Sequence, residues 1–184
     1  MYLLQRGKQS TPGPLENRRS GCYAEAVCKE TRIRQARATD LPALVDLWLE
    51  KMALQQLSDA RTRLAPDARA RRQAAMESWM DNPDCCLLVA TRERQTEGYV
   101  IGCERSGQPG MLPPRRGHVL EMTLAMHSDS NGIGGQLWSA LRDWFGDRGL
   151  DEAIVLVSSR QPVEQAFWRS LAAIEMTDHL WLRT

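Results

Sequence analysis

Three glycines that follow a polar loop, Gly132, Gly134 and Gly135, are the residues of this chain best suited to hold an anion. They begin a segment in which apolar residues recur at helical spacing as far as Trp144. The first backbone N–H groups of a helix lack partners within it, and the helix dipole favours negative charge beside them. Glycine leaves that backbone uncovered. The pattern therefore predicts a phosphate-binding turn, although a strand-to-helix turn that binds nothing has the same pattern.

The cysteines and histidines form no metal-binding or redox pattern. The 5 cysteines include no Cys-x-x-Cys pair, and the 3 histidines lack the spacing of metal ligands. We therefore expect no metal site, and reduced, partly buried thiols in a cytoplasmic protein. The cysteines are Cys22, Cys28, Cys85, Cys86 and Cys103.

Length and charge narrow the class of protein. A chain of 184 residues is long enough for one domain with a substantial core. A formal net charge of +1 argues against a dedicated nucleic-acid-binding protein. No apolar run approaches the ~20 residues that cross a bilayer, so we also expect no membrane partner. Residues 1–31 lack periodicity and predict a flexible or loosely packed N-terminal extension, which leaves 32–184 as the folded domain.

Strands and helices are expected to be interspersed along the folded part. After a first strand, a helix is expected to begin at Thr39 or Asp40, with an irregular segment from Leu54 to Ala65. This order predicts an α/β or α+β layered fold around a mixed sheet. The expected strands span 31–37, 85–91, 98–103, 118–124 and 152–157, and the later helices span 67–80, 132–146 and 162–171.

This order of elements, together with three stretches of sequence, resembles the GNAT superfamily of acetyl-CoA-dependent N-acetyltransferases. Residues 34–44 are similar to the opening strand and first helix of that family, residues 121–138 to its acyl-CoA motif, and residues 161–173 to its second motif. The resemblance implies a mostly antiparallel central sheet whose central strands splay apart, flanked by helices.

The resemblance also implies where acetyl-CoA binds as co-substrate. A bulge at Leu124 would present a backbone N–H to the thioester, and the pantetheine arm would lie between strands 118–124 and 152–157. The pyrophosphate would rest on the amides of residues 130–135. The residues implied in acetyl-CoA binding are Leu124, Ala125, Met126, Ser130, Asn131, Gly132, Ile133, Gly134, Gly135 and Gln161.

Glu121 is the residue implied as catalytic, because several family members place a basic carboxylate on this strand to take the proton of the amine. The alternative is an exposed glutamate that faces solvent or pairs with Arg115 or Arg116. His127, in the following loop, is a second candidate base.

Several positions depart from the family pattern: Gln161 stands for the usual Asn, Ala172 and Ala173 stand for Gly-Phe, and two further departures bear directly on function. Asp129 stands where the family usually has Arg or Gln, and an aspartate there would repel a pyrophosphate. Trp168 replaces a tyrosine that often protonates the departing thiolate, and an indole N–H does not ionise at useful pH. Water, or a donor such as Ser158 or Ser159, would have to replace that tyrosine.

The sequence therefore predicts an N-acetyltransferase that moves acetyl from acetyl-CoA directly to a primary amine of a small molecule or peptide. The alternative is a catalytically weak or inactive acyl-CoA-binding regulatory module, favoured by the two departures. A homodimer is left open.

Overall fold

The computed structural model describes residues 30–126 and 132–177, and these fold around one five-stranded sheet. The strands lie in chain order, and neighbours are antiparallel except for the last two, which are parallel. The strands are β1 (Arg32–Gln35), β2 (Cys85–Arg92), β3 (Gln95–Ser106), β4 (Arg115–Leu124) and β5 (Ala153–Val155). The helices are η1 (Ala38–Asp40), α1 (Leu41–Ser58), α2 (Ala68–Asp81), α3 (Ile133–Gly146) and α4 (Pro162–Ser170).

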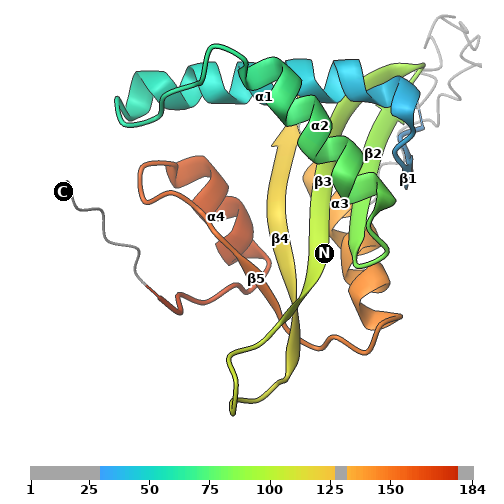
Figure 1. Cartoon of the computed structure of the whole chain (residues 1–184), viewed down its shortest axis with the longest axis vertical. Helices are drawn as coiled ribbons and strands as arrows, with labels where there is room; N and C mark the ends of the chain where they lie inside the picture. The colour runs from blue at the N-terminus through green and yellow to red at the C-terminus, as the bar shows by residue number, and fades with distance from the viewer. Residues whose placement is uncertain (1–29, 127–131, 178–184) are drawn as a thin grey trace, which may run out of the picture.

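Helices cover both faces of the sheet. In Figure 1, α2 crosses in front of β2 and β3 while α3 lies behind them. The apolar run of β3 supplies both faces, because successive side chains of a strand point to opposite sides. Tyr99 and Ile101 join the core under α1 and α2, whereas Val100 joins the core under α3. The continuous apolar character of this strand thus follows from burial on both sides.

The start of α1 is fixed to the first strand by an ion pair. The Asp40 carboxylate accepts hydrogen bonds of 2.7 and 2.8 Å from the Arg34 guanidinium, and this pairing lowers the pKa of Asp40. Pro42 follows in the first helical turn, where no N–H is needed. The helix then continues to Ser58, so the prediction of irregular structure from Leu54 was wrong for its first five residues. Leu54 is half-exposed, and the apolar periodicity therefore ends before the helical backbone does.

A bulge in β4 decides which way its side chains face. Ile101 pairs with Glu121 and Gly102 with Val119, so Leu120 is an extra residue in the β4 strand. Because of this extra residue, Val119 and Met122 both reach the α3 core although they are three residues apart. The expected bulge at Leu124 was wrong, since that residue pairs regularly with Gly98.

The central strands part after a short contact. Only three pairs join β4 to β5, from Gly117–Ala153 to Val119–Val155. Beyond these pairs β5 ends, while β4 continues to Leu124. In Figure 1, α4 lies on the side of β4 that faces away from β3. The splayed strands that the resemblance implied are therefore confirmed, with a β5 shorter than expected.

The cysteine prediction needs correction. Cys85 and Cys103 stand opposite each other on β2 and β3 and form a disulfide, so this pair is not reduced as expected. Their contact depends on strand register, which local sequence does not reveal. Cys86 is a buried free thiol, and burial raises its pKa to about 11.

Within the described ranges, no helix combines the length and the apolar composition needed to span a bilayer.

Candidate functional site

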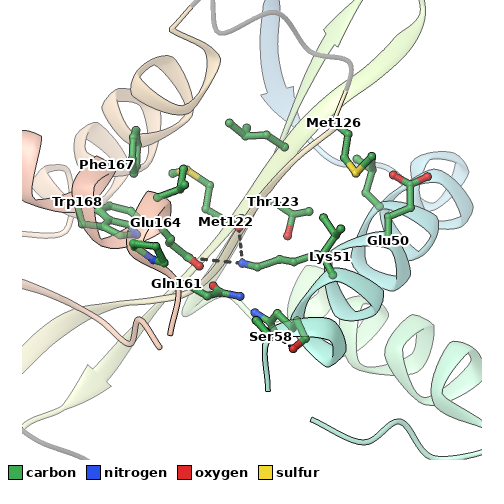
Figure 2. A pocket seen from close by; sticks show the side chains of 16 residues that line it. Glu50, Lys51, Ser58, Met122, Thr123, Met126, Gln161, Glu164, Phe167 and Trp168 are labelled. Atoms are coloured by element: carbon green, nitrogen blue, oxygen red, sulfur yellow. Dashed lines mark hydrogen bonds and ion pairs between the residues drawn. The ribbon is translucent and has the colours of Figure 1, made fainter. Parts of the chain in front are cut away.

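A cavity of about 460 Å³ lies where β4 has left β5. Three elements form its walls: the second half of α1, the end of β4, and the first turns of α4 (Figure 2). Its surface is mostly apolar, with contributions from Leu54, Leu124, Met126 and Phe167. The size and apolar lining are typical of a small-molecule site.

The open edge of β4 presents backbone groups to this cavity. The Met122 carbonyl oxygen accepts a hydrogen bond of 2.9 Å from the Lys51 side chain, so it points away from β3. Ala125 directs its N–H the other way, to the Glu97 carbonyl oxygen at 2.9 Å. Because strand residues alternate, the N–H and C=O of Leu124 are directed to the same side as those of Met122. An extended amide-containing ligand can continue the sheet there.

Lys51 joins the three walls of the cavity. Its Nζ donates to the Met122 carbonyl on β4 and lies 3.4 Å from Glu164 Oε1 on α4 (Figure 2). The side chains of Lys51 and Glu164 are 19% and 22% exposed. Lys51 is the only cationic side chain among the residues that the structure places around this cavity.

The start of α3 is formed by glycine. Gly132 precedes the helix with a left-handed φ of 73°, and no side chain of the described residues caps the first turn. A Cβ at Gly134 would meet the Phe167 ring at 3.0 Å, so this glycine permits close packing of α3 against α4. A Cβ at Gly135 would meet no atom of the described residues within 4 Å. The two glycines thus differ: one makes room for α4, and the other borders no described side chain.

Glu121 belongs to a polar cluster on the α1–α2 face of the sheet. Its Oε1 accepts hydrogen bonds from Arg72 at 2.6 Å, from the Tyr99 hydroxyl, and from Thr123 Oγ1 at 3.3 Å. Arg72 lies between the rings of Trp48 and Trp79, with its guanidinium carbon 5.0 Å from each centroid. Burial, together with the Glu121 carboxylate, raises the pKa of Tyr99. Glu121 therefore pairs with Arg72, not with the Arg115 or Arg116 alternatives.

Glu121 reaches the cavity only through a neighbour. Its side chain does not line the cavity, whereas Thr123, whose hydroxyl contacts the Glu121 carboxylate, does. The β4 bulge turns Glu121 to the α1–α2 face, the same face as Thr123, and Arg72 holds its carboxylate there.

Trp168 occupies the cavity side of α4. It is 4% exposed and packs edge-on against Trp138 and Phe167, with ring centroids 5.5 and 5.0 Å apart. Its indole nitrogen is buried and has no hydrogen-bond partner among the described residues. Ser158 and Ser159, which could have protonated the thiolate in place of tyrosine, are not among the described residues that line the cavity.

The predicted coenzyme residues fall into three groups. Leu124, Met126 and Gln161 line the cavity, whereas Ala125 is buried in the core under α1 and α2. The glycine turn stands at the start of α3, with the Ile133 side chain buried beneath it. Ser130 and Asn131, together with His127 and Asp129, lie outside the described residues.

Sequence reasoning missed Lys51, Arg72 and Glu164. These residues lie on three different helices, and each resembles an ordinary exposed helical charge in the sequence. A weak signal existed for Lys51, the only lysine between residues 30 and 184.

Comparison with known proteins gives the class of fold. No family model matches the chain, and no curated protein matches it. A tetramutant of the BH1408 protein from Bacillus halodurans is similar, with a TM-score of 0.72, 16% identity, and coverage of 83% of this chain and 99% of that one. A predicted acetyltransferase with acetyl-CoA from Clostridium acetobutylicum gives 0.69 at 14% identity, over 84% and 96%. The aminoglycoside N-acetyltransferase AAC(6')-Iy in complex with CoA gives 0.65 at 16%, over 84% and 95%.

At these identities the likeness establishes the fold. The chain has the fold of GNAT acetyltransferases, as the resemblance of its sequence implied.

Proposed function

We propose that this protein is an N-acetyltransferase that transfers acetyl from acetyl-CoA to a primary amine. The observation that carries the proposal is the parting of β4 from β5 beside a cavity of about 460 Å³. An unpaired strand edge, an apolar cavity and a glycine-led helix start are what an acylated pantetheine with a diphosphate requires. Structures with this fold include an acetyltransferase with acetyl-CoA and an aminoglycoside acetyltransferase with CoA.

The residues present fit this coenzyme. Leu124 offers its backbone N–H to the thioester carbonyl, where negative charge grows during transfer. From Leu124 the pantetheine arm runs past the end of β4 toward the start of α3, where the diphosphate binds. Gly134 and Gly135 expose first-turn amides to the diphosphate, with Ser130 and Asn131 proposed as further contacts.

Glu121 is the proposed base. Its contact with Thr123 links the carboxylate to the cavity, so an amine proton can reach it through that hydroxyl or a water. Arg72 fixes the direction of the carboxylate through a hydrogen bond of 2.6 Å. In the transfer, the amine nitrogen forms a bond to the thioester carbon, the carbon–sulfur bond breaks with its electron pair on sulfur, and the amine proton leaves to Glu121.

A CoA-binding regulatory module is the second candidate. The Glu121 carboxylate already has three donors, and Trp168 stands in place of the usual acid. Both observations favour a site that holds acyl-CoA without rapid turnover.

One experiment tests both candidates. Thermal melting with CoA and acetyl-CoA measures binding, and thiol release across a panel of amines measures transfer. Aminoglycosides enter the panel first, because several proteins of this fold act on them. An enzyme shows amine-dependent thiol release that Glu121→Gln abolishes while CoA binding persists. Binding with no release for any amine supports the module, and absence of CoA binding refutes both.

Location and assembly remain proposals. A cytoplasmic location agrees with the use of acetyl-CoA, whereas the Cys85–Cys103 disulfide is a bond that a reducing compartment disfavours. Mass analysis of the alkylated, unreduced protein from cells tests the location: alkylated Cys85 and Cys103 support the cytoplasm, and an intact disulfide supports an oxidising compartment. Light scattering tests the homodimer.

A further inference from the structure

One cationic side chain stands among the described residues that line the cavity, and the proposed transfer does not explain its role. Lys51 lies on α1 and extends its ammonium to the open edge of β4 (Figure 2). An ammonium has three N–H donors, and the described contacts of Lys51 use two of them, on Met122 and Glu164. One donor is therefore available to a ligand in the cavity.

The position of Lys51 along β4 matters. Its contact residue, Met122, comes two residues before Leu124 on the same side of the strand. Leu124 is the residue proposed to hold the thioester carbonyl. Backbone sites two residues apart on one strand edge are about 7 Å apart, so Lys51 comes within ~4–6 Å of the thioester sulfur by turning its flexible side chain from Met122 toward Leu124.

Among the described residues, the donors that the sequence suggested for the leaving sulfur are unsuitable or do not line the cavity. The indole nitrogen of Trp168 is buried, and an indole does not ionise in the useful range. Ser158 and Ser159 do not line the cavity. Among the described cavity residues, Lys51 alone carries positive charge.

We propose that the Lys51 ammonium binds and stabilises the thiolate that departs from acetyl-CoA. This inference rests on the proposed function. When the carbon–sulfur bond breaks, its electron pair stays on sulfur, and Lys51 neutralises that charge without having to transfer a proton. Water can protonate the thiolate afterwards. Lys51 thus replaces the missing tyrosine by charge instead of acidity.

The other charges that face the sulfur position act against Lys51 and must be counted. Glu164 holds the ammonium from α4 and works as a positioning residue, although its own negative charge disfavours a thiolate. Glu50 lies one residue before Lys51 on α1, and its side chain is exposed at the rim, where water screens it. Lys51 contacts the strand edge directly, so its charge has the larger effect.

The test measures the thiol of bound CoA and needs no acceptor. The ultraviolet absorbance of the thiolate is titrated in the CoA complex, with the complex of desulfo-CoA subtracted to remove protein cysteines. An opposite charge within ~4–6 Å lowers a pKa by about one to three units, so the bound thiol should ionise that much below free CoA. Lys51→Met should abolish the decrease, and Lys51→Arg should keep most of it. Glu164→Gln should enlarge it.

Arg142→Met is the matched control, because it removes one positive charge from an exposed position on α3. It should leave the thiol pKa unchanged. If CoA binds and Lys51→Met titrates like the wild type, the inference is overturned and the proposed function stands. If Lys51→Met stays folded but loses desulfo-CoA as well, Lys51 serves the pantetheine arm and the inference is also overturned. If the wild type binds no CoA, the proposed function fails together with the inference.

Discussion

Replacing Gly135 with alanine should stabilise the free protein and weaken its binding of CoA. The added Cβ would meet no atom within 4 Å in the described parts of the chain, which therefore accommodate it without strain. Alanine is better than glycine in a helix by about 0.8–1.0 kcal/mol. Because Cβ atoms tilt toward the helix N-terminus, the methyl group would stand over the amides that we propose for the diphosphate.

The loss of affinity can be estimated. A hydrogen bond to a charged group contributes about 1.5–3 kcal/mol, so moving the diphosphate off one amide weakens binding roughly 10- to 150-fold. At 100 times the wild-type Kd, CoA stabilises the wild type by about 2.7 kcal/mol. A 100-fold weaker variant gains only about 0.4 kcal/mol under the same conditions. With roughly 2–4 °C per kcal/mol for a domain of this size, the CoA-induced rise in Tm falls from about 5–11 °C to about 1–2 °C.

Gly146→Ala supplies the control on the same helix. Its Cβ would also meet nothing within 4 Å, and it lies at the opposite end of α3. Both variants should melt at or above the wild-type temperature without ligand, and only Gly135→Ala should lose the response to CoA. A full CoA response in Gly135→Ala would refute the placement of the diphosphate at this helix start.

Three further predictions concern the scaffold. Arg72→Met should lower the free energy of unfolding by about 3–5 kcal/mol in urea titrations, because it leaves the half-buried Glu121 charge without its partner; a loss below 1 kcal/mol would show that the pair is solvated. Asp40 has a folded-state pKa below its ordinary 3.8, so its ion pair contributes stability above that pH and loses it as the pH falls through the lowered value. Asp40→Asn should therefore be less stable than the wild type at pH 7, with a gap that closes in acid, and a gap independent of pH would contradict this. Reducing the Cys85–Cys103 disulfide, which spans 18 residues, should cost about 3 kcal/mol by calorimetry, and the protein with both cysteines changed to alanine should not respond to reductant.

Much of the fold could be predicted from local pattern. Apolar periodicity placed α3 and α4 within a residue or two of their ends, and the glycine-led turn was recognisable from composition alone. The end of α1 was missed because its last turn carries exposed leucines, so that periodicity stopped before the helix did. Strand β4 was predicted too short, because its polar first residues also pair with β3, as Arg115 does with Ser106.

The site was less predictable, because its key relations join residues far apart in the chain. Lys51 and Glu164 are separated by 113 positions, and Arg72 and Glu121 by 49. Nothing in the sequence around Lys51 or Arg72 distinguishes these residues from solvent-exposed charges on a helix. The disulfide was missed for the same reason, since only the β2–β3 register brings its two cysteines together.

The sequence by itself determined the types of element, their order and the glycine-led start of α3, because each of these depends on neighbours within a few residues. Tertiary structure decided the direction of Glu121 and the composition of the cavity. A single extra residue, Leu120, reverses the facing of every β4 side chain after it, and its place depends on how β4 pairs with β3 and packs against α3. Strand register and helix packing are long-range compromises among many contacts, so the chemistry that they bring together is not written in any one stretch of the chain.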